Sequence, residues 1–240
     1  MLLDAGQLYG TTTYGGTGAG CPTQGCGTVF RLAPTTKTLT TLRELVPNDG
    51  IAPVATLVRA PSGLLYGTAS EAGPHGSGTV FRLDLSSETF AVVHGFDYHV
   101  DGSGSDADLL IKKGFTYGTM RAGGPTAAGD GTIYKLDPGT GTVTTLYSFP
   151  GQGGGIFPDF GVVAGAKGLL YGATVQGGGS GAGTLFQFNP KTLAFAMSHD
   201  FDISDGVAPS GPLLADKSGA LYGVTSGGGH GSGTVFKLVP

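Results

Sequence analysis

The sequence has no tryptophan, only two cysteines and few charged residues, which make up 12% of its 240 positions. It also has no apolar run of the 18 or so residues that a membrane-spanning helix requires, so we expect no membrane span. The formal net charge of −4 provides no basic surface for phosphate groups, which argues against nucleic acid as a partner. The N-terminus lacks a basic region followed by an apolar segment, so we expect no signal peptide in the chain as given.

Glycine and proline are abundant instead, with 47 glycines and 14 prolines. This content approaches that of disordered chains. However, 39% of the residues are hydrophobic, and they recur in short, regular runs that supply enough apolar surface for a core. The glycines therefore indicate ordered turns between many short strands.

The two cysteines, Cys21 and Cys26, lie in the stretch CPTQGC. We expect them to form a disulfide that closes one loop, which favours an oxidising compartment and a secreted or cell-surface location. A metal pair is the alternative, although two thiolates fall short of the four ligands of a structural zinc site.

Two short motifs recur five times in constant order. Tyr-Gly occurs at spacings of 51 to 57 residues, at Tyr9, Tyr66, Tyr117, Tyr171 and Tyr222. A Gly-Thr-apolar-aromatic motif follows each one at spacings of 50 to 53 residues, beginning at Gly27, Gly78, Gly131, Gly183 and Gly233. Each unit contains four short apolar runs that alternate as strands do. Four-stranded units of about 50 residues predict an all-β fold, the β-propeller.

The five units predict one domain of residues 1–240 with five blades, at approximately 1–46, 47–97, 98–150, 151–202 and 203–240. The fifth unit ends at Pro240 without a fourth apolar run, and the first unit begins directly with its first strand. The N-terminus therefore has no spare strand to complete the last blade. We expect a five-bladed ring that is closed by side-chain packing, with a three-stranded last blade. A fragment of a longer array is the alternative.

These units resemble the Gloeobacter/Verrucomicrobia-type (GloVer) tandem-repeat family, whose members carry units such as LYGTT…GGxxGxGTVFxL…TTLYSF. The resemblance covers nearly all of residues 1–240. It implies a propeller-like repeat domain of bacterial proteins that are exported or attached to the cell surface. It implies no established activity, so no catalytic residue follows from it.

Antiparallel strand order places the Gly-rich loops, between the second and third strands, on the same face as the connections between blades. Ligands bind at such loop-built mouths in β-architectures. The candidate ligand-binding residues on this face are Tyr14, Gln24, Asp49, Tyr98, His99, Arg121, Asp159, Ser180 and Asp205.

Histidine occurs twice at one position of the Gly-rich loop, as His75 and His230, where the other units have Gln, Ala or Ser. With Asp101 they are candidate catalytic residues, because histidine titrates near neutral pH and a carboxylate can orient it. Alternatively, each histidine only hydrogen-bonds its own loop. His94 and His199, at the end of the fourth strand, are expected to be solvated or to pin a loop.

The stretch DGSGSDAD, residues 101–108, has side-chain oxygens at alternate positions. It departs from an EF-hand because Asp106 stands where the turn needs Gly and Lys112 where the bidentate Glu belongs. We therefore predict no metal site and no cofactor, with calcium or another divalent metal at a different kind of site as the alternative.

Three kinds of function fit these observations. The first is a secreted or surface-associated module that binds a glycan, a similar polymer or a small molecule through several weak sites, although the absence of tryptophan counts against it. The second is a polysaccharide-directed hydrolase or lyase with a His/Asp site at the same mouth, which the divergence among the five loops favours. The third is a structural repeat module. Whether the chain is an enzyme stays open at this point.

Overall fold

The fold consists of short antiparallel strands and almost no helix. A computed structural model describes all residues 1–240 and contains twenty strands. Three helical turns interrupt the connections: η1 (Pro47–Asp49), η2 (Gln152–Gly154) and η3 (Ala166–Gly168). None of the helical segments has the length and apolar character needed to cross a membrane.

The strands form five sheets, which we call blades 1 to 5. Blade 1 contains β1 (Leu2–Asp4), β2 (Gln7–Thr12), β3 (Thr28–Ala33) and β4 (Thr38–Glu44). Blade 2 contains β5 (Val58–Arg59), β6 (Leu65–Ala69), β7 (Thr79–Asp84) and β8 (Thr89–Gly95). Blade 3 contains β9 (Leu110–Lys112), β10 (Phe115–Met120), β11 (Thr132–Asp137) and β12 (Thr142–Ser148). Blade 4 contains β13 (Val162–Ala164), β14 (Leu170–Thr174), β15 (Thr184–Phe188) and β16 (Phe195–Asp200). Blade 5 contains β17 (Val207–Pro209), β18 (Leu214–Ala215), β19 (Leu221–Gly227) and β20 (Val235–Leu238).

Blades 1 to 4 have the expected order, in which each strand pairs with the next one along the chain. Blade 5 has four strands rather than the expected three, because its first strand is divided. β17 pairs with the second half of β19 and β18 with the first half, whereas β20 pairs with β19 on the other edge. No strand lies outside β20, so the outermost strand is absent, as the sequence indicated.

The hydrophobic core lies between neighbouring blades and is divided into four clusters. In the first cluster, Tyr9 and Val29 of blade 1 pack against Leu65 and Phe81 of blade 2. The other three clusters use equivalent residues of the following blades. The aromatic and aliphatic positions of both motifs therefore serve the packing of blade on blade, and they need no functional explanation.

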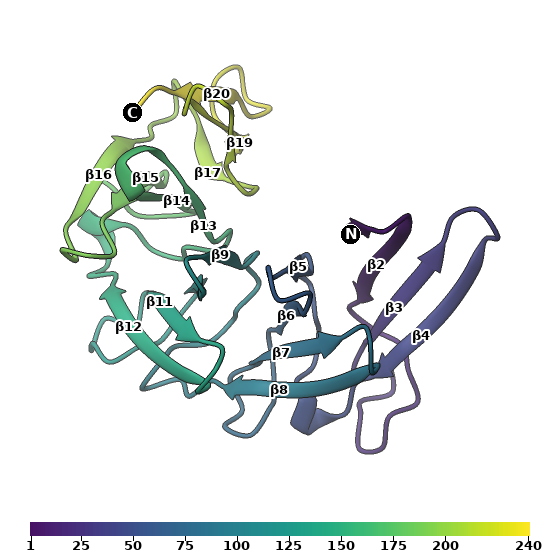
Figure 1. Cartoon of the computed structure of the whole chain (residues 1–240). Coiled ribbons are helices and arrows are strands. Elements are labelled where there is room, and N and C mark those ends of the chain that lie inside the picture. Colours follow the sequence, from purple (N-terminus) through teal and green to yellow (C-terminus); the bar gives the residue numbers. More distant parts are fainter.

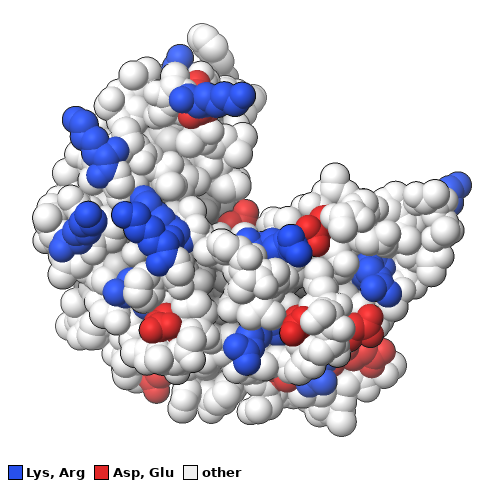
Figure 2. Space-filling view, in the orientation of Figure 1, with Lys and Arg blue, Asp and Glu red and all other residues white.

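The five blades form an open arc and not a closed ring (Figure 1). No hydrophobic cluster joins blade 5 to blade 1, and Figure 2 shows a wide notch between these two blades. Val235 of blade 5 is 81% exposed, whereas its equivalents Val29 and Val80 are fully buried against the next blade. The expected ring closure is therefore not seen: packing joins each blade to the next one, but the exposed faces of blades 1 and 5 do not meet.

The glycine of the Gly-Thr motif is required by backbone geometry in every blade. These five glycines have φ between +87° and +103°, a region that residues with a Cβ rarely adopt. A Cβ at each of them would also lie 2.2 to 2.5 Å from a backbone carbonyl oxygen of the neighbouring strand. The threonine that follows is buried in blades 2 and 3, where Thr79 and Thr132 donate to the carbonyls of Asp49 and Asp101.

Candidate functional site

Three of the inter-blade loops are held by the same kind of contact between a basic side chain and a carboxylate. The basic residue stands near the end of the fourth strand, and the carboxylate lies six or seven residues later in the loop. The pairs are Arg43–Asp49 (Nε to Oδ2, 2.9 Å), His94–Asp101 (Nε2 to Oδ2, 3.0 Å) and His199–Asp205 (Nε2 to Oδ2, 2.7 Å). Each carboxylate also accepts a hydrogen bond from a backbone N–H of its own loop.

We call these three pairs clamps, because each one holds an inter-blade loop against the end of the fourth strand. His94 and His199 therefore have the loop-pinning role expected from the sequence. The clamps also engage Asp101, a candidate catalytic residue, and the candidate ligand-binding residues Asp49 and Asp205. All three carboxylates therefore have partners that close their own loops.

Replacing Asp101 with alanine is expected to lower the free energy of unfolding by about 2–3 kcal/mol, because it leaves buried partners unsatisfied. The Asp101 side chain is 9% exposed, whereas that of Asp205 is 42% exposed. The matched change Asp205→Ala should therefore cost no more than about 1 kcal/mol. Urea unfolding of both variants measures the difference, and equal losses would contradict the clamp as described.

The structure does not bring the two candidate catalytic histidines into one cavity. His75 lines a cavity of about 400 Å³ together with His94, Asp97 and Asp101. His230 is exposed and does not line this cavity; it belongs to blade 5, which blades 3 and 4 separate from blade 2 along the arc (Figure 1). No group of three or more His, Cys, Asp or Glu side chains is arranged to hold a metal ion.

Several other predicted binding residues lie on exposed loops. Tyr14 is 59% exposed and Tyr98 44% exposed, and the Tyr98 ring contacts the His99 ring edge-on at 5.1 Å. Gln24 and Ser180 are exposed as well. Cys21 and Cys26, beside Gln24, form a disulfide with an S–S distance of 2.04 Å.

Arg121 and Asp159, two further predicted binding residues, do meet, at the junction of blades 3 and 4. Arg121 Nη1 lies 3.5 Å from Asp159 Oδ2, and its guanidinium lies over the Phe157 ring at 5.1 Å. The Asp159 side chain is only 14% exposed, and its second oxygen, Oδ1, is buried without a hydrogen-bond partner. Burial raises the pKa of Asp159 to about 6; Arg121 opposes this rise and the Asp106 carboxylate adds to it.

Next to Asp159 in the chain, Phe160 lines a cavity of about 250 Å³ that four blades share. Asp106 and Asp108 of blade 3 line it with Phe160, with Pro212 of blade 5 and with residues 54–56 of blade 2. Asp108 Oδ1 accepts a hydrogen bond from the Thr56 backbone N–H at 2.6 Å, whereas Asp106 has no ion-pair partner. Because four blades contribute, this cavity lies on the inner side of the arc. Its walls combine carboxylate acceptors with apolar surface.

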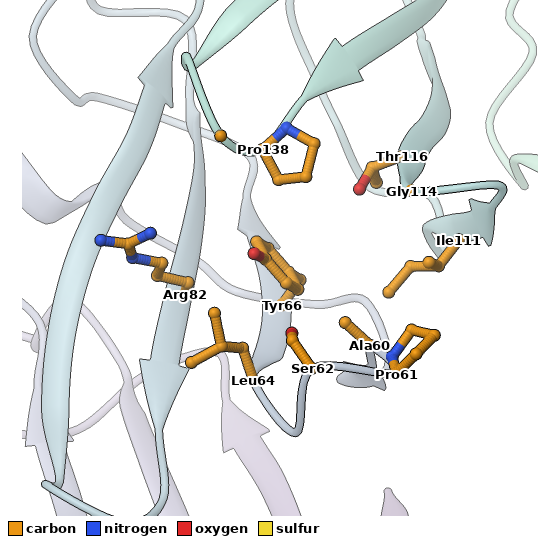
Figure 3. A pocket seen from close by; sticks show the side chains of 11 residues that line it. Ala60, Pro61, Ser62, Leu64, Tyr66, Arg82, Ile111, Gly114, Thr116 and Pro138 are labelled. Atoms are coloured by element: carbon orange, nitrogen blue, oxygen red, sulfur yellow. The ribbon is translucent and has the colours of Figure 1, made fainter.

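Two further cavities involve the opposite ends of the strands, where the sequence predicted no site. One, of about 500 Å³, lies between blades 2 and 3, where Tyr66, Arg82 and Thr116 line it (Figure 3). The other, of about 320 Å³, lies at the equivalent place between blades 3 and 4, and four lysines line it. The sequence did contain a sign of this second cavity. Three short turns each contain lysine, and alignment of the repeats indicates that these turns lie at the same end of the sheets.

The family model of the Gloeobacter/Verrucomicrobia repeat matches residues 1–130 and again residues 110–240. A search of curated proteins gives no match to the sequence.

The fold is similar to that of several solved structures. The extracellular domain of a proposed hybrid two-component system, BT4673 from B. thetaiotaomicron, has a TM-score of 0.60 at 10% identity, over 97% of this chain and 26% of that one. TolB from Acinetobacter baumannii has a TM-score of 0.52 at 15% identity, over 91% and 50% of the two chains. A proposed gluconolactonase has a TM-score of 0.51 at 14% identity, over 89% of this chain and 71% of that one. The chain thus spans about a quarter of the first of these proteins and half of the second, and the likeness supports a propeller-like, all-β fold.

Proposed function

The chain belongs to the Gloeobacter/Verrucomicrobia repeat family, and from this premise we propose that it is a secreted or surface-associated repeat domain that binds a glycan or a similar polymer. The disulfide between Cys21 and Cys26 supports an oxidising location, because such bonds are rare in reducing compartments. The fold likeness to an extracellular domain of BT4673 is in keeping with this location.

The observation that carries the proposal is the buried Oδ1 of Asp159, which has no hydrogen-bond partner. An unsatisfied buried acceptor costs stability, and a ligand hydroxyl or a bound water can supply the missing donor. A sugar hydroxyl is a donor of the right kind, and a carboxylate can accept from two neighbouring hydroxyls. Asp106 and Asp108 supply further acceptors at the cavity that the next residue in the chain, Phe160, lines.

The apolar part of the cavity also suits a sugar. Phe160 and Pro212 line the same space as the two carboxylates, so a ring could place its C–H face on them while its hydroxyls reach the acceptors. Phe160 would thus take the place of the tryptophan that the sequence lacks. The cavity involves inter-blade loops, as the sequence-based hypothesis supposed.

Native gels that contain a soluble neutral polysaccharide test this proposal, with a β-glucan, a mannan and a xylan as probes. At least one of them should retard the protein. Asp159→Asn should raise the dissociation constant derived from that retardation about tenfold, which is the effect of losing a charged hydrogen bond. Asp84→Asn, on an exposed turn, is the matched control and should behave as the parent protein. Retardation that is the same in Asp159→Asn, or absent with all three polysaccharides, would refute the proposal.

A polysaccharide hydrolase or lyase is the second candidate, because a carboxyl with a pKa of about 6 can donate or accept a proton near neutral pH. Asp106 would be the second carboxyl of such a site. Assays for new reducing ends or unsaturated products on the same polysaccharides distinguish the two candidates. Product formation that Asp159→Asn abolishes would favour the enzyme, and binding without product would favour the binding module.

A further inference from the structure

A cleft between blades 3 and 4 gathers four of the thirteen basic side chains of the protein. Lys112 and Lys113 come from the turn between β9 and β10, Lys167 from η3, and Lys191 from the turn between β15 and β16. Figure 2 shows blue side chains close together on the part of the surface formed by blades 3 and 4, with no red between them. We call these four residues the lysine cleft.

None of the four lysines has an ion-pair partner. Lys112 Nζ donates a hydrogen bond to the Gly168 carbonyl at 3.1 Å, and the other three ammonium groups have no hydrogen-bond partner. Partial burial and the neighbouring Lys113 lower the pKa of the Lys112 ammonium group. Like charges that line one cleft destabilise one another, and a bound anion would relieve this repulsion.

The equivalent cleft between blades 2 and 3 shows that the repeat does not require lysine at these positions. Pro61 and Ser62 stand there in place of Lys112 and Lys113, and Gly139 stands in place of Lys191 (Figure 3). Only Lys167 has a lysine, Lys113, at its equivalent position in the preceding blade. The gathering of four lysines is therefore a specific feature of the cleft between blades 3 and 4.

The turn after the third strand gives an independent sign of the same specialisation. In blades 2 and 3 this turn begins with Asp84 and Asp137, whose Oδ1 accepts a backbone N–H two residues later at 2.8 and 2.9 Å. In blade 4 the residue is Asn189, whose Oδ1 accepts the Lys191 N–H at 3.0 Å. The turn of blade 4, which faces the lysines, keeps this hydrogen bond without the negative charge of blades 2 and 3, whereas blade 1 has Ala33 at the position.

We propose that the lysine cleft binds the carboxylate or sulfate groups of an acidic polysaccharide. The ammonium groups are hydrated point charges on flexible stems, which suit anionic groups spaced along a chain better than one planar, bidentate group. Tyr117 and Pro190 give the cleft an apolar wall against which a sugar ring can lie. A nucleic acid is the less favoured polyanion because the net charge of −4 repels a continuous phosphate backbone outside the cleft.

The lysine cleft differs in position and in ligand chemistry from the cavity that Asp106, Asp108 and Phe160 line, which we call the mouth. The mouth presents carboxylates to neutral hydroxyl groups, whereas the lysine cleft presents cations to anions. The lysines lie in turns at the opposite ends of the strands from the inter-blade loops. Binding at the cleft therefore neither requires nor excludes binding at the mouth.

The test is binding of polygalacturonate and dextran sulfate to the full chain at low salt, with neutral dextran and poly(A) RNA as comparison probes. The triple variant Lys113→Gln, Lys167→Gln, Lys191→Gln leaves the partly buried Lys112 in place and should bind at least one of the acidic polysaccharides about tenfold more weakly. A control triple, Lys37→Gln, Lys217→Gln, Lys237→Gln, removes the same charge elsewhere and should change binding by less than about twofold.

Asn189→Asp provides the sharpest single substitution, because it restores to blade 4 the charge that blades 2 and 3 carry. It should weaken binding of the same polysaccharide severalfold without disturbing the turn, since Asp84 and Asp137 make the same hydrogen bond. Equal losses in the two triple variants, no effect of Asn189→Asp, no binding of either acidic polysaccharide, or tighter binding of poly(A) would each overturn the proposal.

Discussion

Replacing Gly131 with alanine is expected to lower the free energy of unfolding by about 3 kcal/mol. Gly131 has φ +103°, and a Cβ there would lie 2.4 Å from the Met120 carbonyl oxygen and 2.7 Å from Pro158. The unfavourable φ and the forced displacement of backbone each contribute about 1–3 kcal/mol. Urea denaturation followed by circular dichroism measures the loss.

Gly153→Ala is the control for this prediction, because Gly153 has no positive φ and no atom within 4 Å of an added Cβ. It should leave the free energy of unfolding within about 0.5 kcal/mol of the parent value. If the two variants lost the same stability, the Gly-Thr glycine would not be the geometric requirement of the blade that we infer.

Replacing Asp159 with asparagine is expected to stabilise the protein above pH 6, although it removes an ion pair. The folded state holds the Asp159 proton up to a pKa of about 6, because burial disfavours the carboxylate, whereas the unfolded chain releases it near 3.8. Between these values the folded state binds more protons than the unfolded state, so the contribution of Asp159 to stability falls as pH rises. The penalty is complete above about pH 6, and asparagine does not carry it.

The free energy of unfolding of Asp159→Asn is expected to exceed that of the parent by about 1–2 kcal/mol at pH 8, and by close to zero at pH 4. These values allow for solvent screening and for the lost contact with Arg121. Thermal unfolding at the two pH values measures it. Asp84→Asn is the matched control, since hydrogen bonds from Ser86 lower the pKa of Asp84 and this exchange should bring no gain. A loss of stability at pH 8 in Asp159→Asn would identify Asp159 as a structural partner of Arg121 instead.

The four-stranded blade could be predicted because the residues that form it lie within a single repeat unit. The Gly-Thr glycine needs its positive φ and its Cβ-free approach to the next strand in all five units, so it recurs and marks each blade. The open arc could not be predicted in this way. The angle between blades depends on how residues such as Tyr9 and Phe81 pack together, and equal repeats are compatible with more than one angle.

The candidate site was predictable in its position and less so in its chemistry. Loop order placed Arg121 and Asp159 on one face, but the raised pKa of Asp159 depends on burial that no sequence pattern records. The opposite holds for Asp101, which pairs with His94 across seven residues, close to the six-residue spacing of the pairs in blades 1 and 4. A comparison of these spacings across the repeats would have indicated this contact.

The lysine cleft was missed for a topological reason. Lys113, Lys167 and Lys191 lie in three different turns, two of them in one blade and one in the preceding blade. Each is an ordinary exposed turn residue when considered alone. Only the placement of equivalent turns side by side, together with the exchange of aspartate for Asn189, shows that their charges gather at one cleft.

Stability and binding measured on one variant test whether Asp159 is retained for a ligand. Calorimetric titration at pH 8 would compare the parent protein and Asp159→Asn with the neutral polysaccharide that retards the parent most strongly, after thermal unfolding of both proteins at the same pH. We expect Asp159→Asn to be more stable than the parent and to bind about tenfold more weakly, because a buried acceptor that is retained for a ligand lowers the stability of the fold. A variant that is more stable and binds equally well would contradict this expectation.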